Sequence, residues 1–130
     1  MYKKIFFVFI TTCIQVLGYA QSSVKENLSP EDFQKKLKAT EQAVLIDVRT
    51  PAEVKQGMIS GAVPIDYNSP EFKSKISKLD KNKPYFVYCA AGGRSSKAAN
   101  LMEELGFKKV YNLSGGITAW QEEGLPVKKK

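Results

Sequence analysis

A single cysteine stands at the point where a predicted strand gives way to a predicted helix. Cys89 follows the β-rich residues 85–88 and begins the segment C-A-A-G-G-R-S, which spans 89–95. A loop of small residues can turn its backbone N–H groups inward, and the first turn of a helix carries positive potential, so both stabilise a thiolate. Arg94 adds a fixed positive charge that suits a tetrahedral oxyanion. The pattern predicts a reactive thiol in an anion-binding loop.

Composition excludes several other cysteine chemistries. The chain contains no histidine, so it cannot form a Cys–His pair of the protease type. Apart from Cys13 in the N-terminal segment, Cys89 is the only cysteine, which is too few ligands for a tetrahedral zinc site and too few thiols for a dithiol redox motif. We therefore expect no metal and no cofactor. A buried, inert thiol is the competing interpretation of Cys89 on composition alone, because free cysteine is often a core residue.

Strands and helices alternate along the chain and form the frame around Cys89. An N-cap residue, a proline and an acid recur in Ser29–Asp32 and Thr50–Glu53, so helices are expected to begin at Pro30 and Pro51. The alternation predicts an α/β domain with a mostly parallel sheet, helices on both faces and a ligand site beyond the carboxyl ends of the strands. Predicted strands cover 43–48, 63–65, 85–88 and 110–113, and the remaining predicted helices cover 69–79, 95–105 and 117–123.

The first twenty residues have the layout of a secretory signal peptide. Lys3 and Lys4 precede an apolar run that is too short to span a membrane, and small residues stand before a predicted cleavage after Ala20. The alternative is a lipoprotein signal, with Cys13 as the lipidated residue. We expect an exported protein, most simply a periplasmic one, with one domain over 28–127 between an exposed lead (21–27) and a basic tail (128–130).

Net charge limits the class of partner. The chain has 20 Lys and Arg against 13 Asp and Glu, but the lysines are scattered and mostly alternate with acids. Nucleic-acid binding would call for a basic face with interleaved aromatic residues, and no segment has that pattern. The excess positive charge favours small anions instead.

Other conspicuous residues have structural interpretations. Trp120 is expected in the core, as tryptophan usually is. Gly115 and Gly116 are expected to serve a backbone bend, because no lysine or further glycine of a nucleotide-binding pattern follows. Tyr67 and Asn68 either line the mouth of the pocket or belong to an ordinary loop.

Four segments, taken together, carry a resemblance. The segments are L-I-D-V-R-T-P-A-E-V, G-M-I-S-G-A-V, C-A-A-G-G-R-S and L-S-G-G-I-T-A-W-Q-E-E-G-L-P-V, in this order between residues 45 and 127. The likeness they carry covers about residues 28 to 127. They resemble the successive motifs of the rhodanese, or thiosulfate sulfurtransferase, family. The resemblance implies a single three-layer domain with a five-stranded parallel core.

The same resemblance implies a reaction and a set of site residues. The residue that matches Cys89 accepts a sulfane sulfur from thiosulfate or another persulfide donor and passes it to cyanide or a thiol. Backbone N–H groups of the loop stabilise the persulfide, and the residue that matches Arg94 orients the anionic donor. The residues so assigned to substrate binding are Ala90, Ala91, Gly92, Gly93, Arg94 and Ser95.

Two details refine the comparison with the family. Related phosphatases have five residues between cysteine and arginine, whereas four separate Cys89 from Arg94, so the tighter loop suits one sulfur atom. Met58 replaces the usual family histidine, outside the active loop. The family's Asp-Val-Arg is present, and Arg49 is expected to support the structure by pairing with Asp47 or Glu53.

The sequence therefore predicts a sulfurtransferase with small sulfur-containing substrates. A non-catalytic module that binds persulfide, an anion or another exported protein is the alternative, and a phosphatase is disfavoured by the short loop. The oligomeric state is open, with a monomer as the simplest expectation.

Overall fold

The computed structural model describes residues 23–129 and shows one five-stranded sheet, in which every paired strand is parallel. The strands are β1 (Val24–Leu28), β2 (Val44–Asp47), β3 (Val63–Pro64), β4 (Pro84–Tyr88) and β5 (Lys109–Leu113). Their order across the sheet is β1-β5-β4-β2-β3, so β4 lies in the middle and β3 at an edge, where Pro64 predicted an edge position or a strand start. The predicted signal peptide, including Cys13, lies outside the described residues.

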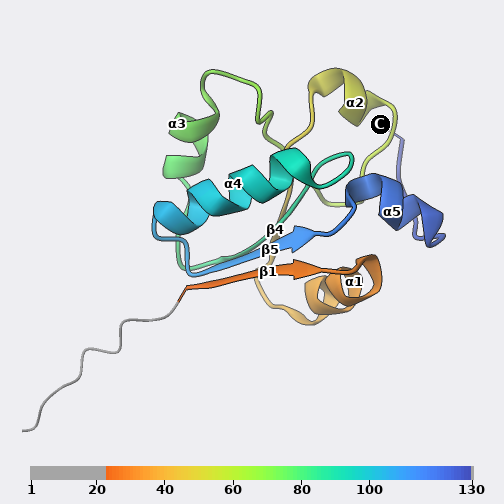
Figure 1. The fold of residues 1–130 in the computed structure, drawn as a ribbon, viewed down its shortest axis with the longest axis horizontal. Helices are drawn as coiled ribbons and strands as arrows, with labels where there is room; N and C mark the ends of the chain where they lie inside the picture. The colour runs from red at the N-terminus through yellow and green to blue at the C-terminus, as the bar shows by residue number, and fades with distance from the viewer. Residues whose placement is uncertain (1–22, 130) are drawn as a thin grey trace, which may run out of the picture.

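Helices cover both faces of this sheet, as Figure 1 shows. The helices are α1 (Pro30–Ala39), α2 (Pro51–Lys55), α3 (Phe72–Ser77), α4 (Gly93–Glu104) and α5 (Gly116–Glu122). The core on one face combines α3 and α4, and the core on the other combines α1 and α5. The predicted three-layer α/β fold is confirmed.

Successive side chains of the central strand β4 point alternately into the two cores. Tyr85 and Val87 point into the core under α3 and α4, whereas Phe86 and Tyr88 point into the core under α1 and α5. All four are at most 1% exposed, and burying each such side chain contributes about 1.5–3 kcal/mol. Strand β4 is thus a rigid base for the residue that follows it.

Trp120 is also buried, as predicted, and its indole N–H donates to the carbonyl of Pro126.

Helix caps follow the sequence signals at two of the predicted starts. The Ser29 hydroxyl accepts from the amide of Asp32 at the start of α1. Thr50 and Glu53 form a complete capping box at the start of α2. These reciprocal bonds satisfy donors that a short helix would otherwise leave unpaired.

The structure corrects the sequence prediction at both ends of the domain. Residues 24–28 form strand β1, although 21–27 were expected to be only an exposed lead; their side chains are largely exposed, but their backbone pairs with β5. Lys128 was assigned to a basic tail, yet its backbone forms an antiparallel bridge with Met58. The domain therefore extends beyond both predicted boundaries.

Three helices begin elsewhere than predicted, α5 by a single residue, at Gly116 instead of Ile117. Helix α3 starts at Phe72, because the residues from Ser69 form a turn in which the Ser69 hydroxyl accepts from the amide of Glu71. Helix α4 starts at Gly93, two residues before the predicted start, because Gly92 takes the N-cap position with a φ of 106°. Within residues 23–129, no helix is long and apolar enough to cross a membrane.

Candidate active site

Cys89 lies directly after β4, at the carboxyl end of the central strand, where ligands of parallel sheets gather. Its side chain is buried, with 2% of its surface exposed. The amide of Gly92 donates to the Cys89 Sγ at 3.0 Å, and the Ser95 hydroxyl lies 3.4 Å from the same atom. The left-handed conformation of Gly92 closes the loop tightly enough for this amide to reach the sulfur. The loop therefore surrounds a single sulfur atom.

These hydrogen-bond donors affect the pKa of the Cys89 thiol. Burial alone would raise the pKa of Cys89, because it penalises the charged form. Hydrogen bonds from the Ser95 hydroxyl and from the amides of Ser95, Gly92 and Ala91 outweigh burial and lower the pKa below its ordinary value. The arrangement favours the thiolate of Cys89 relative to an ordinary cysteine, and the thiolate is the nucleophilic form.

Replacing Ser95 by alanine is expected to raise the pKa of Cys89, because the variant loses a hydrogen bond to the thiolate while burial is unchanged. Alkylation of Cys89 by iodoacetamide, followed against pH, measures this: the acid limb should move to higher pH. Ser96→Ala is the matched control, one residue further along α4, and should leave the profile in place. Identical profiles for Ser95→Ala and the wild type would show that the hydroxyl does not stabilise the thiolate.

The back of the loop rests on the first turn of α5, a contact that sequence reasoning missed. The amide of Ile117 donates to the carbonyl of Cys89 at 2.9 Å, and the amide of Thr118 donates to the carbonyl of Ala90 at 3.1 Å. With these carbonyls held on the outside, the loop amides that follow can face the sulfur. Gly115 and Gly116 have φ values of 75° and 63°, which confirms the predicted backbone bend.

Gly116 has a second role, which is close approach to the loop. A Cβ atom at this position would lie 2.4 Å from the carbonyl oxygen of Ala90 and 2.6 Å from that of Cys89. Only glycine lets α5 approach the loop this closely. The sequence signal was the glycine pair itself, but its target lies on another element and could not be identified from spacing.

Arg94 is held by an acid from another helix. Its Nη1 and Nη2 donate to the two carboxylate oxygens of Glu53 at 2.7 and 2.9 Å, and both side chains are partly exposed. The hydrogen bond from Arg94 is the largest of the effects that lower the pKa of Glu53 to about 2, so the carboxylate stays ionised at any working pH. The bidentate pair fixes α2 to the start of α4. The pair also partly neutralises the positive charge of Arg94, which was expected to orient the anionic sulfur donor.

Arg49 belongs to the support of the site. Of the two partners considered for it, Asp47 is the one used: Arg49 Nη2 and Asp47 Oδ2 are 2.7 Å apart, and both side chains are almost fully buried. Glu53 offers Arg49 only a backbone carbonyl. Arg49 also donates to the carbonyl of Gly57 at 2.6 Å, so the pair anchors the segment that follows α2.

Three other residues considered from the sequence make contacts of their own. Met58, where the family usually has histidine, pairs through its backbone with Lys128. Tyr67 packs edge-on against Phe72, and Asn68 is an exposed loop residue. Residues 23–129 contain no group of three or more His, Cys, Asp or Glu side chains that could hold a metal ion.

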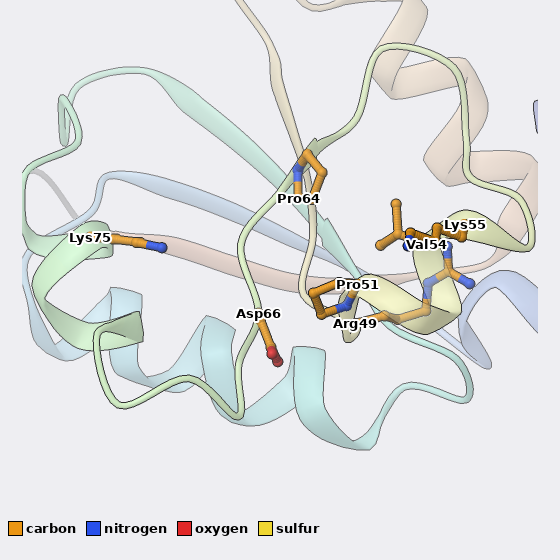
Figure 2. A pocket seen from close by; sticks show the side chains of 7 residues that line it. All are labelled: Arg49, Pro51, Val54, Lys55, Pro64, Asp66 and Lys75. Carbon is orange, nitrogen blue, oxygen red and sulfur yellow. The ribbon is translucent and has the colours of Figure 1, made fainter. Parts of the chain in front are cut away.

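A cavity of about 570 Å³ borders helix α2 (Figure 2). It is bordered by residues of the β2–α2 segment, by β3 with the loop after it, and by α3, and Cys89 is not among them. The lining residues are Arg49, Pro51, Val54, Lys55, Pro64, Asp66 and Lys75.

Comparison with known proteins decides the family. Residues 29–123 match the Rhodanese-like domain. The chain belongs to the rhodanese-like domain family. A sulfurtransferase of Allochromatium vinosum is 36% identical over 100 residues, which cover 77% of this chain and 92% of that protein. A putative sulfurtransferase of Bacillus subtilis, YtwF, is 40% identical over 103 residues, which cover 79% of this chain and 96% of that protein.

Solved structures agree with this assignment. The crystal structure of a rhodanese-related protein from Thermoplasma volcanium superposes with a TM-score of 0.71 at 31% sequence identity, covering 81% of this chain and 99% of that one. The relatives named as sulfurtransferases are nearly spanned by this rhodanese domain. Residues 23–129 thus hold one rhodanese-like domain.

Proposed function

We propose that this rhodanese domain transfers sulfane sulfur through a persulfide on Cys89, with thiosulfate or an organic persulfide as donor and cyanide or a thiol as acceptor. The observation that carries the proposal is the geometry around Cys89: a thiol with a lowered pKa, at a central strand end, in direct hydrogen bond with the Gly92 amide. In a persulfide anion the charge lies on the outer sulfur, one bond beyond Sγ, so the donors around Sγ would lie close to that charge and help to stabilise it.

The first step forms one sulfur–sulfur bond and breaks another. The Cys89 thiolate attacks the outer sulfur of thiosulfate, and sulfite leaves with the electron pair of the broken bond. In the second step cyanide attacks the outer sulfur of the persulfide, thiocyanate departs, and the thiolate is restored. No external oxidant or reductant is needed, and two easier displacements replace one direct transfer.

The size of the loop supports sulfur transfer over phosphate ester hydrolysis. Four residues separate Cys89 from Arg94, and the last of them, Gly93, already belongs to α4. The Gly92 amide is thus directed at the cysteine sulfur itself, at 3.0 Å. Arg94 adds positive charge at the edge of the loop, yet a donor must compete with Glu53 for it.

Replacing Glu53 by glutamine is expected to lower the KM for thiosulfate by about fivefold, because the uncharged amide leaves the Arg94 charge available to a dianion in a partly solvent-screened site. Steady-state rates with thiosulfate and cyanide measure it, and the gain should shrink as salt is added. Glu104→Gln, an exposed substitution on the same helix as Arg94, is the control. An unchanged or higher KM in Glu53→Gln would show that Glu53 does not compete with the donor.

A further inference from the structure

The cavity beside α2 combines an apolar floor with positive ends. Pro51, Val54 and Pro64 form its apolar part, and Figure 2 shows Lys75 at one side and Lys55 at the other. Its volume of about 570 Å³ lies within the range of small-molecule sites, roughly 300–1,000 Å³. A thiosulfate or cyanide ion would fill only a small part of it.

The two lysines of the cavity differ from Arg49 and Arg94 in their ion pairing. Arg49 is paired with Asp47, and Arg94 is paired with Glu53. Lys55 and Lys75 form no ion pair with any residue between 23 and 129. One acid, Asp66, borders the cavity, so its positive charge is in excess. Among the residues that line the cavity, the cations without an acidic partner are therefore these two lysines.

The cavity and the Cys89 loop are connected through helix α2 and the carboxyl edge of the sheet. Strands β2 and β4 pair with Asp47 opposite Tyr88, so Arg49, two residues after β2, and Cys89, directly after β4, lie at the same edge of the sheet. Helix α2 presents Glu53 to Arg94 of the Cys89 helix, and presents Val54 and Lys55 to the cavity. Helix α2 therefore borders the cavity and also contacts the helix that begins at the Cys89 loop.

Resting on the proposed function, we propose that this cavity binds the anionic body of the sulfur acceptor, an organic thiol with two carboxylates and an apolar middle, between Lys55 and Lys75. The apolar floor would contact the carbon chain, and the lysines would hold the carboxylates. Cyanide and thiosulfate would not use the cavity.

A binding experiment tests the cavity without the reaction. Isotope-labelled Cys89→Ser protein, which cannot transfer sulfur, is titrated with glutarate, adipate and pimelate, and with hexanoate as the single-charge control. We expect saturable amide shifts along α2 and α3, stronger for a dicarboxylate than for hexanoate. The double substitution Lys55→Gln with Lys75→Gln should weaken binding about tenfold, whereas Lys97→Gln on α4 should not. Shifts that are absent, or unaltered by the double substitution, overturn the proposal.

A kinetic experiment separates this proposal from the proposed function. 2-Mercaptoadipate, a thiol with two carboxylates and an apolar chain between them, and neutral thioglycerol are compared as acceptors, with thiosulfate as donor. In the double variant, the KM for 2-mercaptoadipate should rise about tenfold, and the constants for thioglycerol and cyanide should stay the same. Turnover with equal losses for all acceptors rejects the cavity but keeps the sulfurtransferase. Lysine-dependent dicarboxylate binding without any turnover rejects the sulfurtransferase but keeps the cavity as an anion site.

Discussion

Replacing Cys89 by serine is expected to abolish thiocyanate formation from thiosulfate and cyanide, by at least about a thousandfold. A serine hydroxyl is not ionised at neutral pH and forms no sulfur–sulfur bond, so the first displacement has no nucleophile. The measurement is the rate of thiocyanate release by equal amounts of folded wild-type and variant protein.

The control for this variant is its fold. Serine is close in size to cysteine, and its oxygen can accept from the Gly92 amide, so Cys89→Ser should melt within a few degrees of the wild type. Residual turnover at wild-type level in a folded variant would assign the reaction to another group. A wild type that binds sulfite but never turns over would favour the anion-binding module considered from the sequence.

Replacing Gly116 by alanine is expected to reduce the transfer rate at least tenfold, and to lower the free energy of unfolding by about 1–3 kcal/mol. The new Cβ would lie 2.4 Å from the Ala90 carbonyl oxygen, so α5 or the Cys89 loop must move. Either movement weakens the bonds from Ile117 and Thr118 that hold the loop carbonyls, and with them the direction of the amides toward the sulfur. Rates with thiosulfate and chemical unfolding measure the two effects.

Gly124→Ala is a matched control for this substitution. Gly124 has a φ of 74°, close to the 63° of Gly116, but a Cβ atom there would meet nothing within 4 Å. The control therefore shares the cost of alanine in a left-handed conformation, about 1 kcal/mol, without the clash, and its transfer rate should equal that of the wild type. Equal rates for Gly116→Ala and Gly124→Ala would show that α5 does not position the loop.

Most of the frame could be predicted because its signals are local. Proline and an N-cap residue identified the starts of α1 and α2, and the apolar run before Cys89 identified β4. Strand β1 was missed because its side chains are largely exposed and its stability comes from backbone bonds to β5. An edge strand of this kind has no hydrophobic alternation to detect.

Only those parts of the site whose residues are neighbours in the sequence could be predicted. The loop from Cys89 to Arg94 was visible because strand, small residues and helix follow one another directly. The partner of Arg94 could not be predicted, because Glu53 lies 41 residues away in the sequence. Whether Glu53 pairs with Arg94 or with Arg49 depends on where α2 packs. The start of α4 was misplaced because Gly92 serves as N-cap through a positive φ, where a polar side chain would be usual.

The mass of Cys89 after reaction tests the central claim most directly. Folded protein is incubated with thiosulfate, freed of excess reagent without reductant, and analysed by mass spectrometry before and after addition of cyanide. We predict a gain of about 32 Da, one sulfur atom, on the peptide that contains Cys89, and its loss when cyanide is added. No gain with thiosulfate or any organic persulfide, in protein whose Cys89 is reduced and reactive toward iodoacetamide, would contradict the account.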